Sequence, residues 1–114
     1  MSKLMCFAAP IIPGKEDTWR AFMKELQTTR KAEFIASRKN NGVRERTFLQ
    51  ETPHGSTVIV TLKGDDPAGS FAKIGQGTDE FTKWFVASVK DIHGFDLSAP
   101  PPGPMPEMIL DSGA

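Results

Sequence analysis

The sequence lacks several features that would place it in a functional class at once. It has a single cysteine, Cys6, so no disulfide can form within the chain. Basic and acidic side chains number 14 each, whereas proteins that bind nucleic acids or anionic membranes carry an excess of lysine and arginine. No apolar run approaches the ~20 residues that cross a membrane. We therefore expect no nucleic-acid partner, no membrane partner and a cytoplasmic location.

The sequence also lacks the residue spacing of a metal or cofactor site. His54, His93 and Cys6 show no short ligand spacing such as H-x-x-x-H or C-x-x-C, and nothing specifies axial ligation of haem. The glycines of Gly75-Gln76-Gly77 end a predicted helix and lack the lysine of a phosphate-binding loop. We expect neither a metal ion nor an organic cofactor.

What the sequence does contain is a pattern of alternating strands and helices within 114 residues, the length of one domain. The β-branched run 57–62 is the clearest strand. One helical stripe is formed by Trp19, Phe22, Met23 and Leu26. The predicted strands are 4–9, 43–51, 56–63 and 107–111, and the predicted helices are 15–37, 67–74 and 79–92. The expected N-caps of the last two helices are Asp66, and Thr78 or Asp79. This order, β-α-β-β-α-(α)-β, predicts an α+β fold, a ferredoxin-like sandwich with an antiparallel sheet.

Two parts of the chain differ in composition. Residues 1–97 hold the predicted domain, and we interpret its first apolar run as a strand, with a targeting segment as the alternative. Residues 98–114 form an arm with five prolines between positions 100 and 106, which excludes a helix or a central strand. We expect this arm to dock its apolar segment 107–111 on a sheet edge, most naturally that of a partner subunit. A frayed tail is the alternative.

The predicted first and third strands are apolar on both faces, whereas the helices can cover only one face of the sheet. We therefore expect a homodimer that buries the second face. The strand 43–51 carries charges on both faces. Since an unpaired buried charge is unfavourable, Glu45 is expected to pair with Arg44 or Arg46 of the other subunit. An exposed edge strand with solvated charges is the alternative.

Three stretches carry a resemblance to a known group: residues 45–55, residues 64–67, and residues 81–85 together with 92–96. They resemble a group of small uncharacterised bacterial proteins in the dimeric α+β barrel superfamily, over roughly residues 3–97. The wider superfamily includes cofactor-free antibiotic-biosynthesis-type monooxygenases, haem-degrading monooxygenases, stress-response barrel proteins and small lactone isomerases. The resemblance implies two sheets packed face to face across a twofold axis, and a cavity in each subunit between sheet and helices.

A few side chains are candidates for chemistry in such a cavity. His93 follows an aromatic helix, where a neutral imidazole could act as a catalytic base; a histidine that caps the helix end is the alternative. Trp19 and Trp84 are candidate walls of a substrate-binding cavity, with plain core packing as the alternative. The candidate polar anchors for a substrate are Arg38, Arg46 and Gln50.

These residues leave three functions open. The first is a protein that binds a small apolar or aromatic molecule in the cavity. The second is a cofactor-free, monooxygenase-like enzyme that uses His93. The third is a non-catalytic dimeric interaction or stress-associated protein with a filled core. The sequence does not decide whether the protein is an enzyme. An open cavity above ~300 Å³ that His93 or Gln50 enters would favour the first two functions, whereas a closed interior with both histidines in solvent would favour the third.

Overall fold

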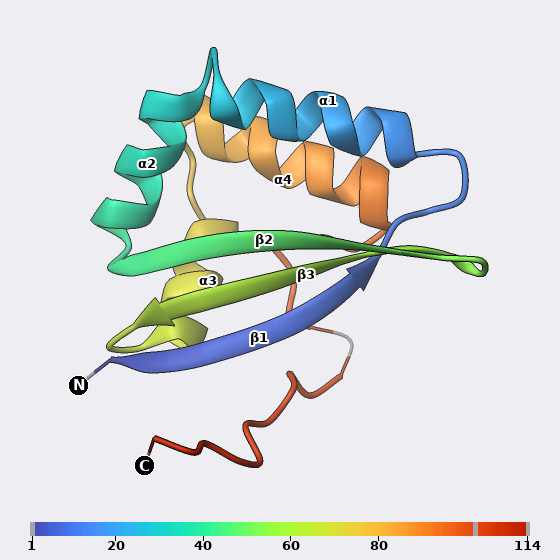
Figure 1. Ribbon diagram of the computed structural model, residues 1–114. Coiled ribbons are helices and arrows are strands. Elements are labelled where there is room, and N and C mark those ends of the chain that lie inside the picture. Colours follow the sequence, from blue (N-terminus) through green and yellow to red (C-terminus); the bar gives the residue numbers. More distant parts are fainter. Residues whose placement is uncertain (1, 102, 114) are drawn as a thin grey trace.

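The structure is a three-stranded antiparallel sheet with helices packed on one face (Figure 1). This computed structural model describes residues 2–101 and 103–113. In chain order the elements are β1 (Lys3–Pro10), α1 (Glu16–Gln27), α2 (Lys31–Asn40), β2 (Val43–Thr52), β3 (Gly55–Gly64), α3 (Pro67–Gly75) and α4 (Glu80–His93). The α+β class and the antiparallel sheet are confirmed. The ferredoxin-like assignment and the dimer remain predictions.

Strand β3 is the centre of the sheet, since the strands lie in the order β1-β3-β2. Alternate side chains of β3, namely Val58, Val60 and Leu62, are buried beneath the helices. Val60 lies opposite Phe7 of β1 and Thr47 of β2, so the same row defines the helix-facing side of all three strands. One face of the sheet is therefore the floor of the core.

The opposite face of the sheet, which we call the open face, mixes apolar and basic side chains. In its middle row Ile59 pairs with Ala8 and Phe48, and in the next row Thr61 pairs with Cys6 and Arg46. Phe48 is 55% exposed although it is a large apolar side chain. An exposed apolar surface of this kind is typical of an interaction site, so the open face is the surface that the expected homodimer would bury.

The single helix predicted for residues 15–37 is wrong, because α1 and α2 are separate helices. Thr28 leaves the helical conformation, with φ −130° and ψ −92°, and its hydroxyl donates a hydrogen bond to the carbonyl of Lys24 at 2.6 Å. A threonine that bonds the preceding turn is unfavourable for a continuing helix, and Thr29 follows it. The break lets α2 turn down toward β2 while α1 continues along α4 (Figure 1). It thereby brings Arg38 of α2 into the core.

The later helix boundaries follow the predicted caps. The carboxylate of Asp66 accepts a hydrogen bond from the backbone N–H of Gly69 at 3.1 Å, with Pro67 in the first helical position. Asp79 accepts from the hydroxyl of Thr82 at 2.7 Å and from its N–H at 3.0 Å, and these bonds hold the pKa of Asp79 below its ordinary value. Gly94 ends α4 with φ +80°, a left-handed conformation that suits glycine.

The C-terminal arm does not add a strand to the sheet of its own chain. The strand expected at 107–111 is absent there, and these residues are exposed. The start of the arm is nevertheless fixed. The side-chain amide of Gln76 donates to the carbonyl of Ser98 at 2.6 Å, and the backbone of Leu97 approaches Gly75 so closely that a Cβ there would clash. Docking of the arm on a second subunit remains a prediction.

Candidate functional site

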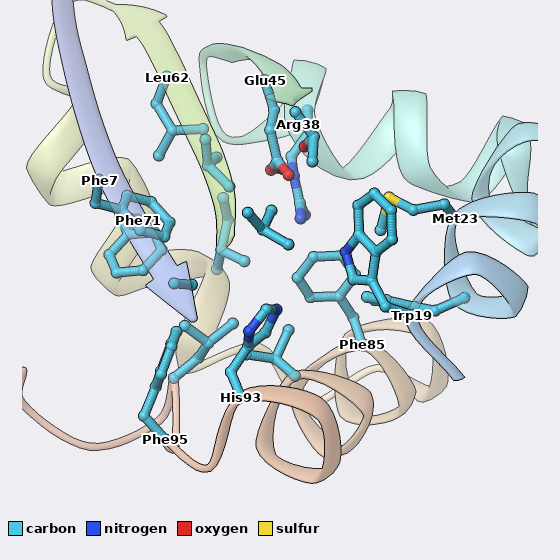
Figure 2. A pocket seen from close by; sticks show the side chains of 18 residues that line it. Phe7, Trp19, Met23, Arg38, Glu45, Leu62, Phe71, Phe85, His93 and Phe95 are labelled. Carbon is cyan, nitrogen blue, oxygen red and sulfur yellow. Dashed lines mark hydrogen bonds and ion pairs between the residues drawn. The ribbon is translucent and has the colours of Figure 1, made fainter. Parts of the chain in front are cut away.

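A cavity lies between the helix-facing side of the sheet and the helices above it (Figure 2). Six of its 18 lining residues carry aromatic side chains, namely Phe7, Trp19, Phe22, Phe71, Phe85 and Phe95, and most of the others are aliphatic. The lining residues that carry polar groups are Trp19, Arg38, Glu45, Thr47 and His93. An apolar enclosure with a few convergent polar groups is the usual form of a small-molecule site.

The cavity is small. The space open to the centres of water molecules is about 50 Å³, whereas the volume between the side chains is about 540 Å³ when the open mouth is included. The smaller figure is the one that compares with ligand-binding cavities, and it falls well below the ~300 Å³ expected of an open one. At ~10–15 Å³ of such space per water, the cavity holds about four water molecules, close to the size of one aromatic ring. Thr47 is exposed although it faces the helices, so the mouth lies beside β2.

A buried ion pair forms one wall of the cavity. The Nε of Arg38 lies 2.7 Å from Oε1 of Glu45, and their side chains are only 6% and 10% exposed. The guanidinium also donates to the hydroxyl of Ser37 at 2.9 Å. It stacks on two rings, 4.8 Å from the centre of Phe34 and 4.4 Å from that of Phe85. Arg38 is therefore held rigidly, and its charge is balanced within the chain.

This pairing replaces the one expected from the sequence. Glu45 was expected to meet Arg44 or Arg46 of another subunit. Instead, strand alternation places Glu45 on the helix-facing side, opposite Leu62, while Arg44 and Arg46 point to the open face. Glu45 is therefore a cavity residue.

His93 closes the other side of the cavity from the last turn of α4 (Figure 2). Its Nδ1 lies 2.9 Å from the carbonyl oxygen of Pro10, at the end of β1. Since a carbonyl can only accept, Nδ1 carries the proton and Nε2 of the neutral ring is an acceptor. Burial lowers the pKa of His93, partly offset by the bond to Pro10. The backbone N–H of Gly94, rather than the imidazole, caps the helix by bonding the carbonyl of Lys90.

The state of His93 predicts how stability depends on pH. The pKa of His93 is lower in the folded chain than its ordinary value of 6.5, so the unfolded chain binds more protons as pH falls below about 6.5. The free energy of unfolding should therefore be unaffected by His93 above that pH and should decline as pH falls toward the folded pKa.

Urea unfolding between about pH 7.5 and pH 5 measures this dependence of stability on pH. His93→Gln should reduce it, whereas His54→Gln, in the exposed hairpin turn, should preserve it. Equal slopes for wild type and His93→Gln would contradict the assignment.

The two tryptophans lie in different places. Trp19 of α1 is buried in the cavity wall. Trp84 of α4 instead packs in a separate surface groove between α1 and α4, with the guanidinium of Arg30 only 4.2 Å above its ring. Arg30 also forms a two-bond ion pair with Glu80, each bond 3.0 Å long. Trp84 is thus half-buried, with its ring against Phe22 and Phe81 on the side of α4 away from the cavity.

Three of the six candidate site residues come together, and three do not. Trp19, Arg38 and His93 line the cavity. Trp84 lies outside it, and Arg46 and Gln50 are exposed on the open face of the sheet. Sequence reasoning missed Glu45 and the rings Phe7, Phe71 and Phe95. Strand alternation in β2 was the available signal for Glu45. It places Glu45 and Thr47 on one face of the strand, and Arg46 and Gln50 on the other face.

Comparisons with other proteins assign no relationship to this chain. No family model matches it, and no curated protein and no solved structure matches it. Within residues 2–101 and 103–113, no three His, Cys, Asp or Glu side chains cluster in a way that could hold a metal ion. Over the same residues, no helix has the length and apolar character to span a membrane. The fold and the site thus define an α+β domain with an aromatic-lined cavity.

Proposed function

We propose that this chain is a dimeric α+β barrel protein of the ferredoxin-like type that binds a small aromatic molecule in the cavity between sheet and helices. The observation that carries the proposal is the combination around one cavity of aromatic side chains, the buried ion pair of Arg38 with Glu45, and the neutral imidazole of His93. A core packed only for stability is not expected to contain ionised and titratable side chains, because their burial is unfavourable.

The polar groups indicate the chemistry of the ligand. Arg38 is neutralised by Glu45, so the cavity offers no unbalanced positive charge for a carboxylate. Nε2 of His93 accepts hydrogen bonds, and so does the carboxylate of Glu45. The cavity therefore suits a neutral ligand that has one aromatic ring and donates a hydrogen bond, as a phenol does.

Intrinsic fluorescence tests this proposal with the chain's own tryptophans. Trp84→Phe leaves Trp19 in the cavity, and Trp19→Phe leaves Trp84 outside it. Phenol should change the emission of the Trp84→Phe variant saturably and leave that of Trp19→Phe nearly unchanged. Toluene should bind roughly 2- to 10-fold more weakly for want of one hydrogen bond, and benzoate more weakly still. Equal, non-saturating quenching in both variants would contradict the proposal.

The homodimer is the second part of the proposal. It is supported by the open face, where Phe48, Leu4 and Ile59 lie on one surface with no described helix above them. Packing of two such faces against each other would bury these side chains and give the barrel that the sequence resemblance implies. Stable homodimer interfaces of this kind bury roughly 2,000 Å² or more. Light scattering at micromolar concentration should give the mass of two chains.

A cofactor-free, monooxygenase-like enzyme is the second candidate function. The observation that favours it is the neutral His93, because a free Nε2 can remove the proton from a bound hydroxyl group. Oxygen uptake in the presence of hydroquinone tests it. Uptake that is lost in His93→Gln and kept in His54→Gln would support an enzyme, whereas equal rates in all three proteins would exclude this role for His93.

A further inference from the structure

The two outer strands of the sheet differ in how their free edges are protected. Strand β2 carries charges at Arg44, Arg46 and Glu51 and is flanked by α2. Strand β1 also packs against a helix, α3, but it carries no charged side chain between Lys3 and Pro10, where its sequence is Leu-Met-Cys-Phe-Ala-Ala. An unprotected apolar edge with free N–H and C=O groups readily pairs with another strand. The edge of β1 is therefore the reactive edge of this sheet.

The C-terminal arm has the properties of a strand that lacks a partner. Met108, Ile109 and Leu110 are 51%, 81% and 88% exposed. The segment 107–111 contains no proline, whereas Pro104 and Pro106 prevent regular pairing further upstream. This pairing segment is thus five residues long, and its apolar centre is flanked by Glu107 and Asp111.

The arm begins close to β1 and is long enough to leave its own chain. Its start is held on α3 by the bond from Gln76 to Ser98, and α3 packs on β1 through Phe71 and Phe7, whose ring centres are 5.0 Å apart. Residues 99–106 span ~25 Å if extended as a polyproline helix. In Figure 1 the arm lies apart from α1 and α4, below β1 in the view.

We propose that residues 107–111 of one copy of this chain add as an edge strand to β1 of a second copy, and that the exchange is reciprocal. Pairing would give hydrogen-bond partners to the free backbone N–H and C=O groups of β1. The apolar centre of the segment would lie against the apolar side chains of β1. One of the two acidic flanks, Glu107 or Asp111, would lie near the basic end of the sheet, where Lys3 begins β1 and Lys63 lies opposite Leu4. A reciprocal exchange closes as a twofold dimer and leaves neither β1 edge open.

The segment that pairs with β1 comes from a second copy, because within one chain the β1 edge and residues 107–111 both remain unpaired. Within one chain, β1 pairs with β3 alone among the described strands, and the arm residues remain exposed. The proposal does not depend on ligand binding in the cavity, so the two can fail separately. It is also distinct from contact between open faces, because it uses the edge of β1.

Disulfide trapping tests the exchange, because Cys6 lies on β1 and is the only cysteine of the chain. Facing side chains on adjacent strands have Cβ atoms about 4.5–5.5 Å apart, near the range of a disulfide. Wild-type chains are mixed with a Cys6→Ser chain that also carries Met108→Cys, Ile109→Cys or Leu110→Cys. Any disulfide between the two kinds of chain must then join different copies. Gly103→Cys in the same background is the control, since it lies upstream of the pairing segment.

We expect mild oxidation to link the mixed chains at one or more of the three positions and not at position 103. Mass spectrometry of the linked peptides identifies the partners. Two results would overturn the proposal. One is the absence of a link at all three positions. The other is a link within a single chain when Ile109→Cys is made with Cys6 retained, because the arm would then occupy its own β1 edge.

Discussion

Arg38→Met should lower the free energy of unfolding by about 3–5 kcal/mol, because it leaves the carboxylate of Glu45 buried without its partner. The pair is only 6% and 10% exposed, so water cannot replace the lost guanidinium. The substitution also removes the stacking on Phe34 and Phe85. For a domain of this size, thermal unfolding should shift down by roughly 10–30 °C.

The matched control is the double variant Arg38→Met with Glu45→Leu. Replacing both charges by apolar groups removes the unpaired carboxylate, so most of the lost stability should return. Lys31→Met, at an exposed position of the same helix, should change stability by less than about 0.5 kcal/mol. If Arg38→Met alone costs no more than Lys31→Met, the ion pair does not have the buried role assigned to it.

Val60→Asp should abolish folding, whereas Ile59→Asp should leave the chain folded. The two residues are neighbours on the central strand, but Val60 is buried beneath the helices and Ile59 lies on the open face. A carboxylate at position 60 would be buried without a partner, at a cost comparable to the whole stability of a small domain. Circular dichroism and urea unfolding measure the difference.

The same pair of variants separates folding from assembly. If two open faces pack together, Ile59→Asp should convert the dimer to a folded monomer, as measured by light scattering at micromolar concentration. Near-equal stability of the two variants would show that the faces of β3 have been assigned incorrectly. A folded Ile59→Asp protein that is still a dimer would place the main interface elsewhere.

Local signals in the sequence predicted much of the fold. The β-branched run of β3 and the caps at Asp66 and Asp79 depend on neighbouring residues, and they appear where expected. The break between α1 and α2 was missed because Phe34 extends the apolar stripe of α1 in the right phase. Only Thr28 and Thr29 marked the boundary. The hydrogen bond from the Thr28 hydroxyl to the carbonyl of Lys24 is visible only in three dimensions.

The candidate site was harder to predict because it depends on long-range contacts. Strand alternation shows that Glu45 and Arg46 lie on opposite faces, but not which face receives the helices. The partner of Glu45 could not be read from the sequence, because Arg38 reaches it only after the turn that follows α1. Likewise, the bond from His93 to Pro10 joins residues 83 positions apart. Periodicity identified Trp84 as apolar but could not show that Arg30 covers it on the outer surface.

We propose that the cavity beside Trp19, Arg38 and His93 is a ligand-binding site. Two-dimensional proton–nitrogen NMR during a titration with phenol tests it most directly, because the chain has only two indole N–H groups, those of Trp19 and Trp84. We predict a saturable shift of the Trp19 indole signal and of the signals of the His93 ring, while the Trp84 signal stays in place. The absence of any saturable shift at Trp19 and His93, or equal shifts at both indoles, would contradict the claim.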